Sequence, residues 1–341
     1  MKIIDAHVHF SRIATFEECA RGTSEVDYSE CGYLSEATAN GVVRSVCMGL
    51  AETAPGGFPD ARAATPMCAD LAVGTNVPTG IYTPTGKYTP AGIYTPTGMH
   101  TRTGIYTPAG THTPADTHTP TGMHTRTGIY TPVGMHTCLG INPHTLSDNS
   151  LAETEALVKG GTGVVGLKLY AGYYHFDITD PVYDPVYMLS EKYDLAIVIH
   201  TGDTFSARGL LKYSHPLRVD ELAVAHPDLR IVACHMGVPW VFDACEVAAK
   251  NPNVYIDLSG ILVGNAAFIG RQADNPLILD RYRQALAFME SYDKVIYGSD
   301  WPLVPMGAYI GFCKKLIPQE EHEKVFYENA MKVFKLKEDG I

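Results

Sequence analysis

The sequence predicts a single (β/α)₈ barrel that spans residues 1–341 and carries one insertion. Short apolar stretches alternate with helical stretches along the chain, which is typical of a parallel sheet covered by helices. Eight of these apolar stretches have the length of a strand, and polar side chains able to do chemistry follow several of them. Without a repetitive segment described below, about 280 residues remain, which is close to the usual size of such a barrel.

The predicted strands are near-continuous apolar runs, as expected for parallel strands buried on both faces. They cover residues 3–9, 42–49, 136–141, 164–170, 196–200, 230–235, 253–259 and 294–298. Helical patterns lie between them, for example at residues 151–159, 185–193, 219–226, 241–250 and 276–292, and a last helix is predicted at 319–334.

A six-residue repeat, of which GIYTPT is one unit, occupies residues 80–139, and Thr stands at the fourth position of all ten units. Frequent Pro and Gly are typical of low-complexity segments, and Pro blocks helix formation. A hexapeptide β-solenoid is the alternative, but Lys87, Thr111 and Thr117 would interrupt its aliphatic core. We therefore expect residues 80–133 to be a disordered or loosely extended insertion between helix 2 and strand 3 of the barrel.

The amino-acid composition of the chain argues against some classes of binding partner. The formal net charge of -11 argues against nucleic acid, because phosphate binding needs an excess of Lys and Arg. No run of about 18 apolar residues predicts a membrane span, and the first residues do not resemble a signal peptide. The eight cysteines form no CxxC pair, so we expect reduced thiols in a cytoplasmic protein. A small-molecule substrate is the expected partner, and a homodimer is left open.

Polar side chains stand at the carboxyl ends of the predicted strands, where barrel active sites are built. His7 and His9 are two residues apart on one strand, so their side chains share a face. His200, His235 and Asp300 follow three later strands. A hydrogen-bonded pair of core histidines would explain the first two alone, but not five such groups. Imidazoles together with a carboxylate predict one divalent ion, with Zn²⁺ preferred over Mn²⁺ or Fe²⁺.

The order of these motifs resembles the amidohydrolase superfamily, in particular the amidohydrolase-2 branch that includes decarboxylases of the aminocarboxymuconate-semialdehyde type. The resemblance rests on His-Val-His at the first strand, His200, His235, and Gly-Ser-Asp-Trp-Pro around Asp300, and it covers nearly all of the chain outside the repeat. It implies that His7, His9, His200 and Asp300 bind the metal. It also implies that His235 is catalytic, or that it binds a second metal as in binuclear members.

Lys168 has three interpretations. We favour the first, in which Lys168 is a cation that holds a substrate carboxylate. The resemblance also allows a second, in which this lysine is carbamylated and bridges two metals. In the third, Lys168 has only a structural role. Tyr170, Arg208 and Trp301 lie at or after strand ends and are further candidates for substrate binding.

Together these residues predict a hydrolase that uses a metal-activated water on a small, carboxylate-bearing ester, lactone or amide. Asp300 would accept the proton of that water, and His235 would polarise the substrate carbonyl. Non-oxidative decarboxylation, known among the relatives, is the alternative reaction. A more distant alternative is a non-enzymatic interaction protein that acts through the Thr/Pro repeat, for which the strand-end groups would be unnecessary.

Overall fold

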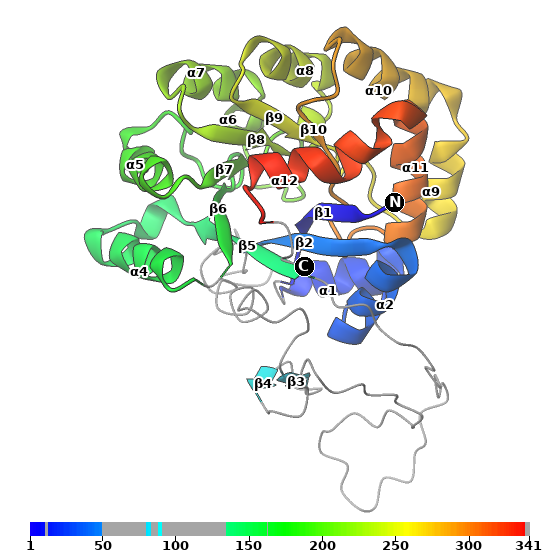
Figure 1. Cartoon of the computed structure of the whole chain (residues 1–341), viewed down its shortest axis with the longest axis horizontal. Helices are drawn as coiled ribbons and strands as arrows, with labels where there is room; N and C mark the ends of the chain where they lie inside the picture. The colour runs from blue at the N-terminus through cyan, green and yellow to red at the C-terminus, as the bar shows by residue number, and fades with distance from the viewer. Residues whose placement is uncertain (11–12, 50–79, 83–87, 91–133, 162, 338–341) are drawn as a thin grey trace, which may run out of the picture.

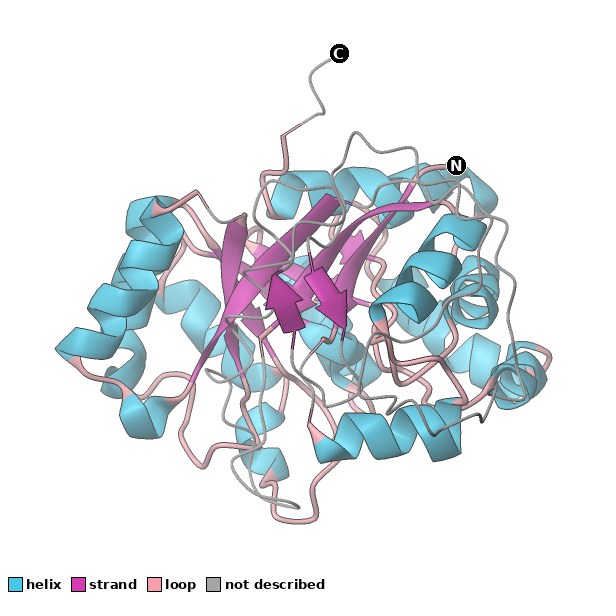
Figure 2. Cartoon of the chain, turned by 90° about the horizontal axis from the view of Figure 1, so that it is seen from below, coloured by secondary structure: helices cyan, strands magenta, loops and turns pink. Residues whose placement is uncertain are grey.

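The computed structural model describes residues 1–10, 13–49, 80–82, 88–90, 134–161 and 163–337. Eight parallel strands form one sheet, in which each strand pairs with the next of the eight along the chain. Helices surround this sheet on its outer side (Figures 1 and 2). The strands are β1 (Ile3–Val8), β2 (Val42–Met48), β5 (Gly134–Ile141), β6 (Val164–Leu169), β7 (Ala196–Ile199), β8 (Arg230–Ala233), β9 (Val254–Asp257) and β10 (Val295–Ile296).

Backbone hydrogen bonds between β1 and the segment that follows β10 close the barrel. The Ala6 N–H donates to the Tyr297 carbonyl at 3.0 Å, and the Asp300 N–H donates to the His7 carbonyl at 2.8 Å. The predicted (β/α)₈ class is therefore confirmed, with all eight strands near their predicted positions.

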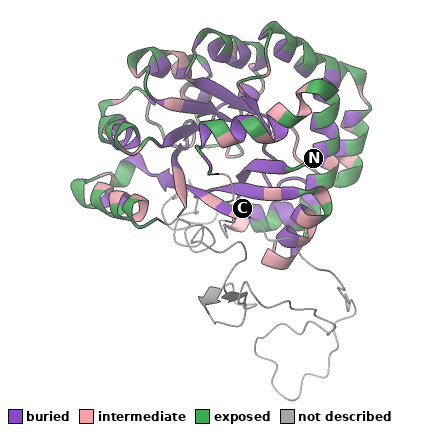
Figure 3. Cartoon of the chain, viewed as in Figure 1, coloured by how far each residue is buried: buried purple, intermediate pink, exposed green. Residues whose placement is uncertain are grey.

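The helices bury one face against the sheet and expose the other (Figure 3). Local signals mark their ends: Ser147 forms a capping box at the start of α4, and Gly41 ends α2 with a φ of 74°. No helix of the described residues is long and apolar enough to cross a membrane. The helices are α1 (Ala14–Cys19), α2 (Glu30–Asn40), α4 (Asp148–Lys159), α5 (Asp184–Tyr193), α6 (Leu211–Ser214), α7 (Leu217–Ala225), α8 (Val241–Lys250), α9 (Ala266–Ala273), α10 (Pro276–Phe288), α11 (Met306–Leu316) and α12 (Asn329–Val333).

Several elements differ in extent from the prediction, three of them near the C-terminus. Strand β10 has two residues rather than five, because the chain beyond it bonds to β1 at the closing contact. The helix predicted at 276–292 ends at Phe288. The helix predicted at 319–334 is divided into a 3-10 turn at Gln319–Glu321, a π turn at Lys324–Glu328 and the short helix α12.

Apolar side chains fill the interior of the barrel, among them Val46, Val198 and Val232. Phe334, directly after α12, packs with them, so the C-terminal helix covers the amino-terminal end of the barrel (red in Figure 1). The remaining strand positions pack against the surrounding helices in a second, larger core. Both faces of the strands are thus buried, as their apolar runs predicted.

The repeat lies largely outside the described residues. Its first parts, β3 (Gly80–Tyr82) and β4 (Tyr88–Pro90), form a separate antiparallel pair. Its last unit begins β5, which pairs with β2 on one side and β6 on the other. The prediction of a disordered or loosely extended insertion between helix 2 and strand 3 falls on residues that the structure does not describe.

Deletion of residues 80–133 is expected to leave a folded and active protein. Gly134 begins β5 at the amino-terminal end of the barrel, whereas barrel active sites form at the carboxyl ends of the strands. Closure entropy grows only slowly with loop length, so shortening the connection changes stability little. Thermal unfolding followed by circular dichroism should show a melting temperature within about 4 °C of the full-length protein. Loss of cooperative unfolding would show that the repeat supports the barrel.

Candidate metal centre

His7 and His9 reach the mouth of the barrel because β1 is irregular. Ile4 and Ala6 belong to the interior core, whereas Val8 packs in the outer core. The alternation of side chains therefore breaks between Ala6 and Val8, in the same stretch where the pairing register with β2 shifts. The two imidazoles lie together, with ring centroids 5.2 Å apart.

Asp300 faces these imidazoles from the turn after β10. Its φ of 64° is in the left-handed region, which is uncommon for residues other than Gly. Its Oδ1 lies 3.1 Å from His9 Nε2 and 3.5 Å from His7 Nε2. Burial raises the pKa of Asp300, but its interactions with His7 and His9 outweigh burial and hold this pKa well below its usual range. An ionised carboxylate therefore meets two imidazoles at one point.

These three donor atoms fit one divalent ion. His7 Nε2 is buried and has no hydrogen-bond partner among the described residues, which is rare for a buried polar atom unless a ligand satisfies it. Donors of a tetrahedral ion bound at about 2.1 Å lie about 3.4 Å from each other. The two separations from Asp300 Oδ1, 3.1 and 3.5 Å, agree with that spacing.

Asp257, the last residue of β9, fixes the ring of His7. Its Oδ2 lies 2.9 Å from His7 Nδ1, and because an ionised carboxylate only accepts, the hydrogen resides on Nδ1 and the lone pair on Nε2. Burial raises the pKa of Asp257, but interactions with His7 and His235 outweigh burial and keep this carboxyl ionised. Burial and the nearby charge of Lys168 lower the pKa of His7 to about 3. The ring is thus neutral, oriented and ready to bind a metal through Nε2.

His235 stands next to this group at the turn after β8. Its Nδ1 lies 3.1 Å from the carbonyl oxygen of Ser259, so Nδ1 carries the hydrogen and Nε2 presents a lone pair. Its ring centroid is 5.1 Å from that of His7 and 5.0 Å from that of His200. Burial lowers the pKa of His235, which favours the neutral ring.

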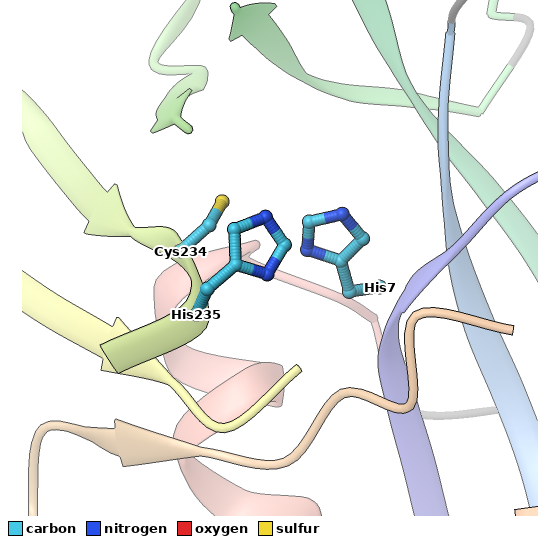
Figure 4. A group of neighbouring side chains, drawn as sticks. All are labelled: His7, Cys234 and His235. Atoms are coloured by element: carbon cyan, nitrogen blue, oxygen red, sulfur yellow. The ribbon is translucent and has the colours of Figure 1, made fainter. Parts of the chain in front are cut away.

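His200, at the end of β7, is placed beside His235. Its Nδ1 donates to the Ala171 carbonyl oxygen at 2.9 Å, which leaves Nε2 as the nitrogen able to bind an ion. Two groups of candidate ligands have donor atoms that all lie within 4.8 Å of one another, and neither includes His200. They are His7, His9 and Asp300, and His7, Cys234 and His235 (Figure 4).

The residues predicted to bind substrate occupy different environments. Lys168 is buried beside the histidines, and its Nζ donates to Cys234 Sγ at 2.8 Å. Tyr170 is also buried and donates its hydroxyl to the Gly49 carbonyl oxygen at 2.8 Å. Arg208 is exposed in the loop between β7 and α6. Of these, Lys168 is the side chain whose charge acts on the metal group.

The carbonyl oxygen of Trp301 accepts a hydrogen bond from the His9 N–H at 2.7 Å, but its side chain packs elsewhere. It is fully buried, and its indole N–H donates to Glu36 of α2 at 3.3 Å. Its ring packs against Phe10, Tyr28 and Tyr33. Trp301 therefore joins the end of the barrel to α2, and its contact with substrate stays a prediction.

Three residues that follow the apolar core of β9 belong to the site but were missed: Asp257, Ser259 and Gly260. Ser259 Oγ lies 3.0 Å from His7 Nδ1. A Cβ on Gly260 would lie 2.7 Å from Asp300 Oδ2, and its φ of 60° also favours Gly. The signal that identified the other residues, polar groups at the end of an apolar strand, was present here too.

Asp257→Asn is expected to weaken metal binding 10- to 100-fold, about the usual effect of removing the carboxylate behind a ligating histidine. The amide keeps the shape of the side chain but loses the charge that orients His7. Competition with a chromogenic chelator measures this affinity. Asp203→Asn, which removes an exposed carboxylate in the loop after β7, is the control. Equal affinities in the two variants would show that Asp257 does not position the ligand.

Comparison with known proteins identifies the family of this chain. A family model described as amidohydrolase matches residues 137–336, which is more than half of the chain. No curated protein sequence matches the chain significantly.

Solved structures share the fold at low sequence identity. An uncharacterised TIM-barrel protein of Bordetella bronchiseptica has a TM-score of 0.58 and 16% identity, over 98% of this chain and 99% of that one. A second is a 5-carboxyvanillate decarboxylase of Novosphingobium aromaticivorans, complexed with manganese and 4-hydroxy-3-methoxy-5-nitrobenzoic acid. Its TM-score is 0.57 and its sequence identity 14%, over 98% of this chain and 96% of that one. A probable 2-pyrone-4,6-dicarboxylic acid hydrolase of Acinetobacter baumannii has a TM-score of 0.53 and 14% identity, over 98% of this chain and 100% of that one. With the barrel established and the family model matched over most of its strands, the chain belongs to the amidohydrolase family of enzymes.

Proposed function

We propose that this protein is a metal-dependent hydrolase of a small, carboxylate-bearing ester, lactone or amide. The observation that carries the proposal is the convergence of His7 Nε2, His9 Nε2 and Asp300 Oδ1, spaced as ligands of one ion. Membership of the amidohydrolase family supports hydrolysis. The net charge of -11 supports a small molecule rather than nucleic acid as the partner.

His7, His9, His200 and Asp300 would hold the ion in this proposal. A divalent ion there lowers the pKa of water and polarises a carbonyl oxygen. Imidazole ligands suit Zn²⁺, and a carboxylate also suits Mn²⁺. Manganese is the metal complexed with the 5-carboxyvanillate decarboxylase that shares this fold, so Mn²⁺ deserves equal testing.

The side chains around the ion divide the remaining tasks. Asp300 is ionised and would accept the proton of the attacking water. His235 presents a lone pair at Nε2, so it would take up a proton from solvent there and donate it to the developing oxyanion. Lys168 supplies a positive charge beside the group, which favours a substrate that carries a carboxylate.

Decarboxylation is the second candidate reaction. A decarboxylase is among the solved structures that share this fold, which supports this reaction. In that reaction the substrate carboxylate leaves as CO₂, and the carbon that carried it takes up one proton. Asp300 or His235 would deliver that proton after taking it from solvent.

Metal analysis followed by a substrate screen tests both candidates. The purified protein should hold about one Zn²⁺ or Mn²⁺ per chain, and a chelator should abolish turnover that added metal restores. A panel of lactones, amides and unsaturated or aromatic carboxylates would be followed by acid release for hydrolysis and by CO₂ release for decarboxylation. Failure to retain metal, together with no rise in melting temperature when metal is added, would contradict the proposal. That result would favour the interaction protein acting through its repeat, which needs no metal ligands.

A further inference from the structure

Cys234 and His235 are consecutive residues, yet both side chains face the metal group (Figure 4). Along a regular strand, neighbouring side chains point to opposite faces. Cys234 packs in the interior core with Val232, so a regular continuation would turn His235 outward. The left-handed backbone of His235, with φ 59°, and of Met236, with φ 48°, breaks the alternation. The buried thiol of Cys234 therefore lies beside the imidazoles of His7 and His235.

His7 belongs to both groups of candidate ligands. Its Nδ1 is held by Asp257, so Nε2 is the one nitrogen with a lone pair for an ion of either group. This Nε2 is fully buried and has no hydrogen-bond partner among the residues described. A single lone pair binds a single ion, so the two sets cannot both be filled through His7.

We propose that the chain has two alternative cation positions that share His7: a harder one completed by His9 and Asp300, and a softer one completed by Cys234 and His235. Carboxylate oxygen suits Mn²⁺, whereas thiolate suits a thiophilic ion such as Cd²⁺. The identity of the ion thus decides whether Asp300 or Cys234 is its ligand. This inference rests on the proposed metal centre and adds a choice of ligand set to it.

Binding at the softer position changes the protonation of the thiol. The bond between the ion and Cys234 Sγ forms as the S–H bond breaks, and the proton passes to solvent. Lys168 Nζ, 2.8 Å from that sulfur, is placed to stabilise the negative charge while it forms. Among the described cysteines, Cys234 is the one that belongs to a group of at least three candidate ligands.

The predicted consequence is that Cd²⁺ acts as an inhibitor. An ion at the softer position leaves Asp300 outside its ligand set and occupies the lone pair of His7 that the harder position needs. Cd²⁺ should therefore displace Mn²⁺ one for one rather than bind in addition to it.

Cd²⁺ and Mn²⁺ serve as the two probes on the full-length, metal-stripped protein. Ultraviolet absorption reports a cadmium–thiolate charge-transfer band, and electron paramagnetic resonance reports free Mn²⁺. The wild type should show the band and release Mn²⁺ as Cd²⁺ is added. Cys234→Ala should lose the band and at least tenfold in Cd²⁺ affinity, with Mn²⁺ affinity within twofold of the wild type. Cys245→Ala, which removes an equally buried thiol on α8, should behave as the wild type.

Several results would overturn the inference: a band that persists in folded Cys234→Ala, no band in the wild type, or simultaneous binding of both ions. If Cys234→Ala does not fold, ¹¹³Cd nuclear magnetic resonance of the wild type reports sulfur ligation directly. Absence of Mn²⁺ binding in the wild type would count against the proposed metal centre itself. Mn²⁺ binding without any cadmium–thiolate band would refute only the alternative position.

Discussion

Asp300→Asn is expected to lower kcat/KM by about a thousandfold or more while the barrel stays folded, because general-base catalysis contributes about 10²- to 10⁴-fold. Asn has nearly the same shape, so the left-handed turn at this position and its packing against His9 can persist. It lacks the negative charge that accepts a proton and that binds a cation. Steady-state kinetics of the metal-reconstituted variant measures the effect.

The controls for Asp300→Asn separate chemistry from folding. The melting temperature and the metal content should be recorded alongside turnover, and Asp203→Asn again supplies a carboxylate-to-amide change outside both groups of candidate ligands. Turnover within tenfold of the parent would exclude Asp300 as the proton acceptor. A loss of metal that accounts for the whole loss of turnover would assign Asp300 to binding alone.

His235→Asn is expected to reduce turnover at least a hundredfold, which corresponds to about 2.7 kcal/mol in the barrier. The shorter amide can still donate to the Ser259 carbonyl, but it has no lone pair that accepts a proton. The content of Mn²⁺ should be unchanged, because the harder ligand set is formed by His7, His9 and Asp300. Single-turnover kinetics with the best substrate of the screen would show whether the chemical step is affected.

His226→Asn, at the end of α7, is the matched control for His235→Asn, since that histidine lies at the surface beside Glu191. Turnover within tenfold of the wild type in His235→Asn would exclude the catalytic role. Loss of a second equivalent of metal in this variant would instead indicate a binuclear site. In that case carbamylation of Lys168, one of its three interpretations, becomes the leading one.

The positions of the strands were predictable because each is a largely apolar run, and several of these runs are followed by a polar residue. His7, His9 and Asp300 could be grouped from sequence, since parallel strands bring their carboxyl ends to one edge whatever the loops between them do. Asp257 was equally predictable by this rule, because it ends the apolar core of β9. His200 shows the limit of the rule: it lies at the predicted edge, yet its distance to the other ligands depends on the exact strand register.

Cys234 and Trp301 could not be placed from the sequence because single backbone torsions decide where they point. The alternation rule turns Cys234 and His235 to opposite faces, and only the positive φ at His235 brings them together. Likewise, Trp301 follows Asp300, whose φ of 64° interrupts regular strand geometry. Left-handed torsions at residues other than Gly leave no sequence signal, and they persist where the surrounding fold imposes them.

The contact that closes the barrel has a consequence for biosynthesis. It joins Asp5 to Ser299, which are 294 positions apart, and the proposed ligands lie on both sides of it, with His7 and His9 on one side and Asp300 on the other. A nascent chain emerging from the ribosome therefore displays its histidine pair long before the carboxylate is made. Contacts between such distant segments are the slow ones to form in folding. An ion that binds only the closed barrel, at a free concentration of 100 times its Kd, would stabilise the folded protein by about 2.7 kcal/mol. In cells the metal would thus stabilise the contact between the first and last strands, which is the last part of the barrel to form.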